Sequence, residues 1–219
     1  MKNITLLIGT CDSYSILWNN FVTLTDKYWN IDCKKIFVTE TKIPNYPGYD
    51  VHAPGKLPWS DRMASALKSI DTEYVFFILE DYFFTEEINQ EEILFHTNFL
   101  EEVKGNKVML DVWCRHLTLI NERKWNDRTL YRLSPHSNYL TSMQPSVWKT
   151  DHLKKCMKEN WSPWEFEIPG TNNIKGSEHG TYLMLRDHKL YWNAVRQGLK
   201  LCPGWDEIKQ LHQLQDMNL

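Results

Sequence analysis

The stretch Val75-Phe76-Phe77-Ile78-Leu79-Glu80-Asp81-Tyr82 decides the fold of this chain. Its apolar residues run on without the polar alternation of a strand that faces water on one side. The pattern predicts a strand buried on both faces, as in parallel α/β sheets. Ligands of open α/β sheets bind at the carboxyl ends of the strands. We therefore expect Glu80 and Asp81 to lie in a ligand crevice; the alternative is a helix cap or a surface turn.

Apolar strand patterns and amphipathic helix patterns alternate around this stretch. Buried strands are predicted at 4–8, 35–38 and 107–112, with a short strand at 49–51. Helices are predicted at 15–26, behind an N-cap at Ser60, and at 90–104 behind an N-cap at Asn89. This alternation indicates an α/β fold with a Rossmann-like, mostly parallel sheet flanked by helices.

The pattern changes in the back half of the chain. Segments 131–133 and 139–147 are short and interrupted by Pro and Ser, which indicates irregular or antiparallel pieces. A helix is predicted to begin near Thr150, and the tail 203–216 reads as an amphipathic helix. We interpret residues 1–219 as one domain, with a nucleotide-binding half at 1–115 and an acceptor-side half at 116–219.

Length and composition restrict the class of protein. A chain of 219 residues is long enough for one well-filled core. Its net charge of -3 argues against nucleic-acid binding. The five cysteines form no C-x-x-C pair, so reduced thiols are expected. No apolar run reaches the roughly 20 residues of a membrane span. We expect a cytoplasmic protein, and peripheral association with the inner face of the membrane stays open.

Polar residues follow three of the predicted strands. Thr10 and Asp12 come after the first strand, Glu40 after the second, and Glu80 after the key strand. Parallel strands end at the same edge of a sheet, so one crevice collects these groups. Hydrogen-bonding groups of this kind bind the base and ribose of a nucleotide. The alternative for each group taken alone is that it is an ordinary loop residue without a role in binding.

A phosphate site and a cation site are predicted nearby. The segment Trp59-Ser60-Asp61-Arg62 opens a helix, so free amides at Ser60 and the guanidinium of Arg62 suit a phosphate. An ordinary N-cap with a solvated first turn is the alternative. Asp81 is the candidate metal ligand, because Mg²⁺ or Mn²⁺ would bridge a carboxylate and an anionic diphosphate. Glu80 would support Asp81 or contact the ribose.

A general base is predicted in the segment Trp161–Glu167. If this segment is extended, Glu165 and Glu167 face the same side; if it is helical, they diverge by about 200° and only one enters a pocket. A carboxylate near a crevice and flanked by Trp has a raised pKa and can act as a base. Neither a G-x-G-x-x-G pattern nor a P-loop is present, which argues against dehydrogenases and P-loop kinases.

Taken together, these motifs resemble bacterial GT-A-type glycosyltransferases, family-2-like enzymes of capsule, O-antigen and related polysaccharide pathways. The resemblance covers most of the chain and rests on the order of six segments: Leu6–Tyr14 with Leu17-Trp18, Trp59–Arg62, Leu79–Phe84, Gln144–Lys149, Ser162–Glu167, and Tyr191–Val195 with Gly198. It implies a GT-A fold and the inverting transfer of a sugar from a nucleotide-diphosphate donor, a UDP-sugar first among them, to a glycan or lipid-linked acceptor.

The resemblance also assigns roles to residues of the site. The last acid of a D-x-D motif would hold the metal, but Tyr82 stands where a second Asp is usual. Asp81 with Mn²⁺ or Mg²⁺ would then stabilise the leaving diphosphate, or Arg62, Lys56 or Arg186 would replace the cation. Glu165 or Glu167 would deprotonate the acceptor hydroxyl. The rival functions are a sugar-1-phosphate nucleotidylyltransferase and a non-catalytic carbohydrate-binding protein that uses its ten Trp for stacking.

Overall fold

One nine-stranded sheet forms the centre of the molecule. The computed structural model describes residues 4–110, 116–177, 179–186, 189–196 and 200–217. The strand order is β4-β3-β1-β5-β11-β8-β12-β10-β9. Adjacent strands from β4 to β5 are parallel, β11 is antiparallel to both of its neighbours, and β12 is parallel to β8. The predicted α/β class is confirmed, but the sheet is mixed, because four of its eight neighbouring strand pairs are parallel and four are antiparallel.

The strands of this sheet are short and come from the whole length of the chain. In chain order they are β1 (Ile4–Gly9), β3 (Lys34–Val38), β4 (Asp50–His52), β5 (Tyr74–Leu79), β8 (Lys107–Leu110), β9 (Leu119–Trp125), β10 (Arg128–Leu133), β11 (Ser146–Lys149) and β12 (Thr181–Met184). Among the described residues, three small ribbons lie outside it: β2 (Trp29–Asn30) with β7 (Ile88–Asn89), β6 (Tyr82–Phe84) with β13 (Tyr191–Asn193), and β14 (Val195–Arg196) with β15 (Lys200–Leu201).

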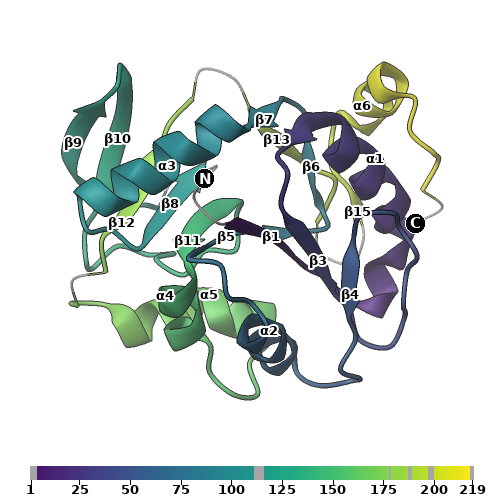
Figure 1. Cartoon of the computed structure of the whole chain (residues 1–219), viewed down its shortest axis with the longest axis horizontal. Helices are drawn as coiled ribbons and strands as arrows, with labels where there is room; N and C mark the ends of the chain where they lie inside the picture. Colours follow the sequence, from purple (N-terminus) through teal and green to yellow (C-terminus); the bar gives the residue numbers. More distant parts are fainter. Residues whose placement is uncertain (1–3, 111–115, 178, 187–188, 197–199, 218–219) are drawn as a thin grey trace.

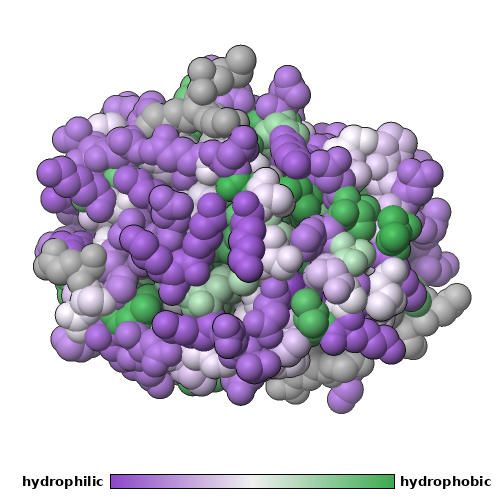
Figure 2. Space-filling model, turned by 60° about the horizontal axis from the view of Figure 1, so that its bottom comes forward, coloured by the Kyte–Doolittle hydropathy of each residue, from purple (hydrophilic) through white to green (hydrophobic). Residues whose placement is uncertain are grey.

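Helices cover both faces of the sheet. They are the 3₁₀ helix η1 (Asp12–Leu17), α1 (Trp18–Tyr28), α2 (Trp59–Lys68), α3 (Gln90–Glu102), α4 (Thr150–Cys156), α5 (Pro163–Ile174) and α6 (Trp205–His212). Figure 1 shows α1 and α3 on one face and α2, α4 and α5 on the other, with α6 beside α1. The face seen in Figure 2 is mostly hydrophilic, and its hydrophobic residues form small separate patches.

The key strand lies where its sequence predicts. Residues 74–78 of β5 are completely buried, because β1 and β11 flank the strand and helices cover both of its faces. Side chains alternate between two cores: Phe76 and Ile78 pack on the side of α1, and Val75 and Phe77 pack on the side of α2. Burial on both faces explains why the apolar run shows no alternation.

The back half of the chain enters the centre of the sheet. Segment 139–147, expected as an antiparallel or irregular piece of an acceptor-side half, leads into β11, and β11 lies between β5 and β8. The antiparallel direction matches one of the two predicted alternatives, but the central position was not predicted. Hydrophobic periodicity reports local structure, and it carries no information on which distant strand becomes a neighbour. The last two residues of the predicted strand 107–112 lie outside the described residues.

Several helix boundaries differ from those predicted. Asn89 caps α3 as expected, because its side chain accepts a hydrogen bond from the amide of Glu92 at 3.1 Å. Ser60 does not cap α2: Pro58 holds the N-cap position, and Ser60 lies in the first turn. The predicted helix at 15–26 begins as the 3₁₀ helix η1 and continues as α1. The C-terminal helix α6 is shorter than the predicted 203–216, because Gln213 turns into the left-handed region.

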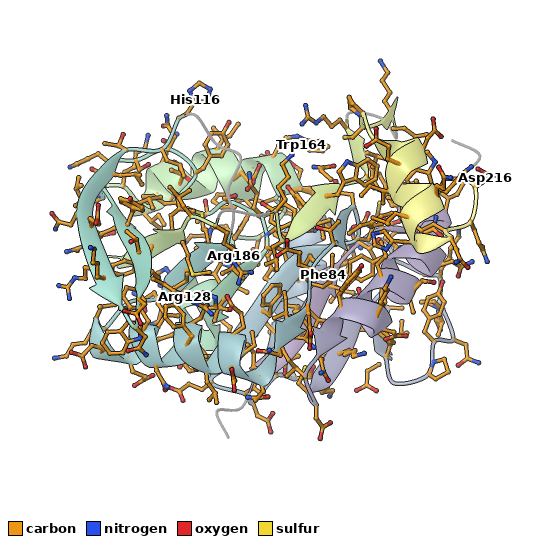
Figure 3. The ribbon with its side chains drawn as sticks, turned by 90° about the horizontal axis from the view of Figure 1, so that it is seen from above. Phe84, His116, Arg128, Trp164, Arg186 and Asp216 are labelled. Atoms are coloured by element: carbon orange, nitrogen blue, oxygen red, sulfur yellow. The ribbon has the colours of Figure 1, made fainter. Side chains whose placement is uncertain are left out.

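A buried carboxylate joins α3 to the far end of the sheet. Glu92 accepts hydrogen bonds from His96 at 2.8 Å and from Arg128 at 2.5 Å, and Arg186 pairs with it at 2.9 Å. Figure 3 shows Arg128 and Arg186 close together near the middle of the view. Burial opposes ionisation of Glu92, but the hydrogen bond from His96 and the two guanidinium groups outweigh it and lower its pKa.

We expect Glu92→Gln to lower the free energy of unfolding at pH 7 by about 1–3 kcal/mol, because two arginines lose a buried anionic partner. The pKa of Glu92 is lower in the folded chain than the unfolded value of 4.5, so its ionised carboxylate stabilises the fold at pH values above 4.5. This stabilisation is lost as the pH falls through the folded pKa. The deficit should therefore shrink in acid. Urea unfolding of both proteins at pH 7 and pH 3.5 measures it. Glu91→Gln, at the exposed neighbouring position, serves as the control.

Two further predictions concern cysteines and the membrane. Cys11, Cys33, Cys156 and Cys202 carry free thiols, and Cys114 lies outside the described residues. Among the helices of the described ranges, none combines the length and the apolar character of a membrane span.

Candidate functional site

The carboxyl ends of β1, β3 and β5 meet at one edge of the sheet. Gly9, the last residue of β1, is level with Val38 on β3 and with Leu79 on β5. The polar residues that follow these strands are therefore brought together, as predicted from the sequence. They form the wall of the candidate site.

Glu80 lies inside this wall, with 5% of its surface exposed. It is hydrogen-bonded to the side chain of Thr10, and this bond and the positive charge of Arg62 both favour its ionised form. Burial and the adjacent carboxylate of Asp81 nevertheless raise the pKa of Glu80 well above its ordinary value. Thr10 is itself held in place, because its hydroxyl accepts a hydrogen bond from the indole of Trp18 at 2.8 Å. A ribose contact by Thr10 or Glu80 stays a prediction.

Asp81 has the least satisfied side chain of the site. Its Oδ1 atom is buried, and within the described ranges no hydrogen-bond partner reaches it. Burial raises the pKa of Asp81 to about 7, and the carboxylate of Glu167 adds to the rise. A buried carboxylate oxygen without a partner is costly. Such an atom suits a ligand that arrives with its own positive charge or with hydrogen-bond donors.

Asp12 holds a loop together. Its carboxylate accepts hydrogen bonds from the backbone amides of residues 40–42 and from the hydroxyl of Thr41. In return, the amide of Asp12 donates to a carboxylate oxygen of Glu40 at 3.0 Å. The two acids thus lock the ends of β1 and β3 to each other. Direct contact of either acid with a donor nucleotide stays a prediction.

Ser60 and Arg62 also have partners within the protein. The hydroxyl of Ser60 accepts the amide of Trp161 at 2.8 Å, so this buried residue ties α2 to the segment before α5. Arg62 is 4% exposed, donates to the backbone oxygen of Thr10 at 2.7 Å and lies 3.8 Å from Glu40. Arg62 was expected to present an exposed guanidinium to a phosphate. Instead its guanidinium is buried and holds the residues that follow β1 and β3 in place. Phosphate binding by these two residues stays a prediction.

The segment with the two candidate bases is helical, which separates Glu165 from Glu167. Ser162 caps α5: its hydroxyl accepts the amide of Glu165, and the carboxylate of Glu165 accepts the amide of Ser162 at 2.7 Å. Glu165 is exposed and occupied in this capping box. Glu167, two residues on, points to the other side of the helix.

Glu167 belongs to the candidate site. Its carboxylate accepts a hydrogen bond from the amide of Met143 at 2.8 Å. Burial raises the pKa of Glu167, and this effect outweighs the opposite influence of the Met143 hydrogen bond and of Lys107. The charge of Glu167 reaches Asp81 and Tyr82, whose pKa values it helps to raise. Of the two predicted bases, the structure brings only Glu167 together with Asp81.

Lys107 is a buried residue that the sequence analysis did not single out. It has no exposed surface, its amino group lies 4.2 Å from the ring centroid of Trp148, and it donates to the backbone oxygens of Leu140 and Ser142. It thereby holds the loop whose next amide, that of Met143, binds Glu167. Burial lowers the pKa of Lys107 to about 7. The only signal for it is a lysine at the start of an otherwise apolar strand.

We expect wild-type stability to rise relative to Lys107→Met between pH 6.5 and pH 9.5. The unfolded lysine holds its proton up to about 10.5, whereas the folded one releases it near 7, so unfolding takes up a proton in this window. Stability therefore increases with pH in the wild type, and the methionine variant lacks this contribution. Urea unfolding at the two pH values measures the difference. The exposed Lys68→Met should follow the wild type, and equal slopes for all three proteins would contradict the expectation.

Residues 191–196 lie beside Asp81 and Tyr82. The amide of Ala194 donates to the backbone oxygen of Asp81 at 2.7 Å, and β13 pairs with β6 so that Asn193 is opposite Tyr82. Arg196 follows on β14, close enough for its charge to act on the phenol of Tyr82. Arg196 was missed because no pattern marks it. The predicted cation substitutes lie elsewhere: Arg186 pairs with Glu92, and Lys56 is exposed in a loop.

Comparisons with known proteins bear on the fold. Neither a protein-family profile nor a curated protein matches the sequence. Among solved structures, the chain is similar to S. aureus TarS. It aligns with TarS 1-349 in complex with UDP-GlcNAc at a TM-score of 0.58 and 14% identity, over 90% of this chain and 59% of that one. It aligns with the complex of TarS 1-349 with UDP at a TM-score of 0.53 and 13% identity, over 87% of this chain and 59% of that one.

The same fold is found in the longer TarS chain, at a TM-score of 0.57 and 11% identity. That alignment covers 96% of this chain and 39% of TarS, so this chain corresponds to part of the longer protein. The likeness shows a shared fold, one that in TarS binds UDP-GlcNAc and UDP.

Proposed function

We propose that this chain is a glycosyltransferase. It moves a sugar from a nucleotide-diphosphate donor, with a UDP-sugar as the first choice, to a hydroxyl group of a glycan or lipid-linked acceptor in bacterial surface polysaccharide biosynthesis. The observation that carries the proposal is that Asp81 and Glu167 are near enough for the charge of Glu167 to raise the pKa of Asp81. Asp81 offers a buried carboxylate oxygen without a partner among the described residues, and Glu167 offers a carboxylate with a raised pKa. The fold shared with TarS, which binds UDP-GlcNAc, supports the choice of donor.

In the proposed reaction Glu167 acts as the general base. It takes the proton of the acceptor hydroxyl, and the freed oxygen forms a bond to the anomeric carbon of the donor. The bond from that carbon to the diphosphate breaks, and its electron pair leaves with the nucleotide diphosphate. Attack opposite to the leaving group inverts the anomeric centre. The raised pKa of Glu167 brings it closer to the range in which a carboxylate can accept a proton.

Asp81 fits one ligand position of a divalent cation. Its buried Oδ1 atom has no hydrogen-bond partner among the described residues, and Mg²⁺ sites that bind nucleotides commonly combine one or two carboxylates with substrate phosphates. The described residues contain no group of three His, Cys, Asp or Glu that would form a cage of their own. Mn²⁺ or Mg²⁺ on Asp81 would supply positive charge to the leaving diphosphate. Arg196, near Tyr82, is the side chain that would serve a diphosphate without a metal.

The function is tested by incubating the protein with UDP-sugars and oligosaccharide acceptors, with Mn²⁺ or with EDTA, and measuring released UDP. We expect UDP release that increases when the acceptor is added. Pyrophosphate release from UTP and a sugar 1-phosphate would instead favour a nucleotidylyltransferase. Sugar binding without nucleotide binding would favour a carbohydrate-binding protein. Thermal shifts with UDP alone, with and without Mn²⁺, report donor binding independently of turnover.

A further inference from the structure

A cavity of about 270 Å³ opens beside Glu167. Helix α5 forms one wall, and the loop that leads to β11 forms the other; we call this cavity the α5 pocket. Its lining consists of His116, Asn138, Tyr139, Glu167, Ile168, Thr171 and Asn172. Glu167 therefore belongs both to the site of Asp81 and to this pocket. A molecule held in the pocket has its polar groups next to the proposed base.

The lining mixes polar and apolar surface and is almost uncharged. Among the described lining residues, Glu167 is the only carboxylate, and neither lysine nor arginine takes part. Asn138 and Asn172 present amides, which both donate and accept hydrogen bonds. The Oδ1 atom of Asn138 is held by Lys175 at 3.2 Å, which orients this amide. Neutral donors and acceptors of this kind match sugar hydroxyls, whereas neither a lysine nor an arginine is among the described lining residues to meet a phosphate, and the ammonium of Lys175 behind the lining is engaged by Asn138.

The loop wall is held in a strained conformation. Tyr139 has a φ of 56°, in the left-handed region, which is rare for a bulky side chain. The surrounding structure maintains it: Tyr139 accepts a backbone hydrogen bond from Ser142, and Thr141 bonds to the backbone oxygen of Phe166 at 2.7 Å. Strain of this type concentrates at ligand-binding positions. The pocket is thus preformed by contacts between the loop and α5.

Two exposed apolar side chains, Trp164 and Ile168, extend the pocket along α5. Trp164, Ile168 and Asn172 follow one another at intervals of four residues and so lie on the same side of the helix. Ile168 and Asn172 line the pocket, and Trp164 lies one turn beyond it with 68% of its surface exposed. Figure 3 shows Trp164 and His116 on the same side of the molecule. A flat indole beside hydrogen-bonding groups suits the apolar face of a second sugar ring.

We propose that the α5 pocket binds an uncharged sugar residue at the end of the acceptor, with a hydroxyl on Glu167, and that Trp164 stacks on the next sugar of the chain. This inference rests on the proposed function and names its acceptor: a neutral oligosaccharide rather than a phosphate-bearing chain. The size agrees, since 270 Å³ lies just below the roughly 300–1,000 Å³ of pockets for drug-sized ligands and holds one sugar.

The experiment compares two neighbouring asparagines of α5. Both are exposed, but Asn172 lines the pocket and Asn173 does not. Saturation-transfer NMR with the full chain and UDP measures binding of glucose, galactose and N-acetylglucosamine, of their neutral disaccharides, and of the 6-phosphates of the same monosaccharides. We expect Asn172→Ala to weaken the binding of neutral disaccharides about five- to tenfold, because one hydrogen bond to the sugar is lost. Asn173→Ala should leave their binding unchanged. Trp164→Ala should weaken disaccharides more than monosaccharides.

Three outcomes would overturn the inference: none of the neutral sugars binds, the phosphorylated sugars bind more tightly, or the two asparagine variants behave alike. UDP binding is followed in the same samples by thermal shift and should be equal in all variants. Loss of UDP binding in the wild type would instead count against the proposed function. The two failures are therefore distinguishable.

Discussion

Glu167→Gln should reduce kcat for UDP release by about 10²–10⁴-fold, the usual contribution of a general base. The amide oxygen of glutamine can still accept the hydrogen bond from Met143, so the loop and α5 should keep their positions. Glutamine cannot take a proton from the acceptor at neutral pH. The KM for the donor should change little, because the variant removes a group that acts in the transition state. Steady-state kinetics with a saturating acceptor measures both constants.

Glu165→Gln is the matched control, since Glu165 lies two residues away on the same helix. It is exposed and forms the capping box with Ser162. This variant should retain kcat and lose only a small amount of thermal stability. Full activity in Glu167→Gln together with an inactive Glu165→Gln would reverse the assignment. Wild-type kcat should fall in acid with an apparent pKa above 4.5, because burial raises the pKa of Glu167.

Asp81→Asn should lower UDP release at least about a hundredfold without lowering stability. Asparagine has the same shape but lacks the negative charge that is proposed to hold a cation at the leaving diphosphate. The charge does not stabilise the fold, because the buried Oδ1 atom has no partner among the described residues. Activity assays and thermal melts of the same samples measure both effects. Asp71→Asn, at an exposed residue just before the other end of β5, is the control.

The pH dependence of stability gives a second measure of Asp81, taken in EDTA without nucleotide. The folded pKa of about 7 lies above the ordinary 3.8, so the folded chain holds a proton that the unfolded chain has lost. This contribution is complete below 3.8 and disappears as the pH rises through 7. Asp81→Asn should therefore gain over the wild type at pH 8 and gain less at pH 5. A difference that does not change with pH would contradict a buried, unpaired carboxylate.

The candidate site was predictable to the extent that it depends on parallel strands. Residues at the carboxyl ends of β1, β3 and β5 must lie at one edge once those strands are parallel, so Thr10, Glu40 and Glu80 were found from the sequence. Their partners were not. That Arg62 is buried against Thr10 depends on how α2 packs on the sheet. No local pattern contains that contact.

The sequence by itself determined the buried strand β5, the acids at its end and the two-sided α/β layering, because hydrophobic periodicity and the order of elements are local properties. The capping box between Ser162 and Glu165 is a local feature, and it makes the segment helical. Only the tertiary structure, however, places Glu167 where its charge acts on Asp81, through the loop that Lys107 holds and whose Met143 amide binds Glu167. Tertiary structure also placed β11 in the middle of the sheet. Such contacts join residues far apart in the chain, and their energies arise from burial and hydrogen bonding that exist only after folding.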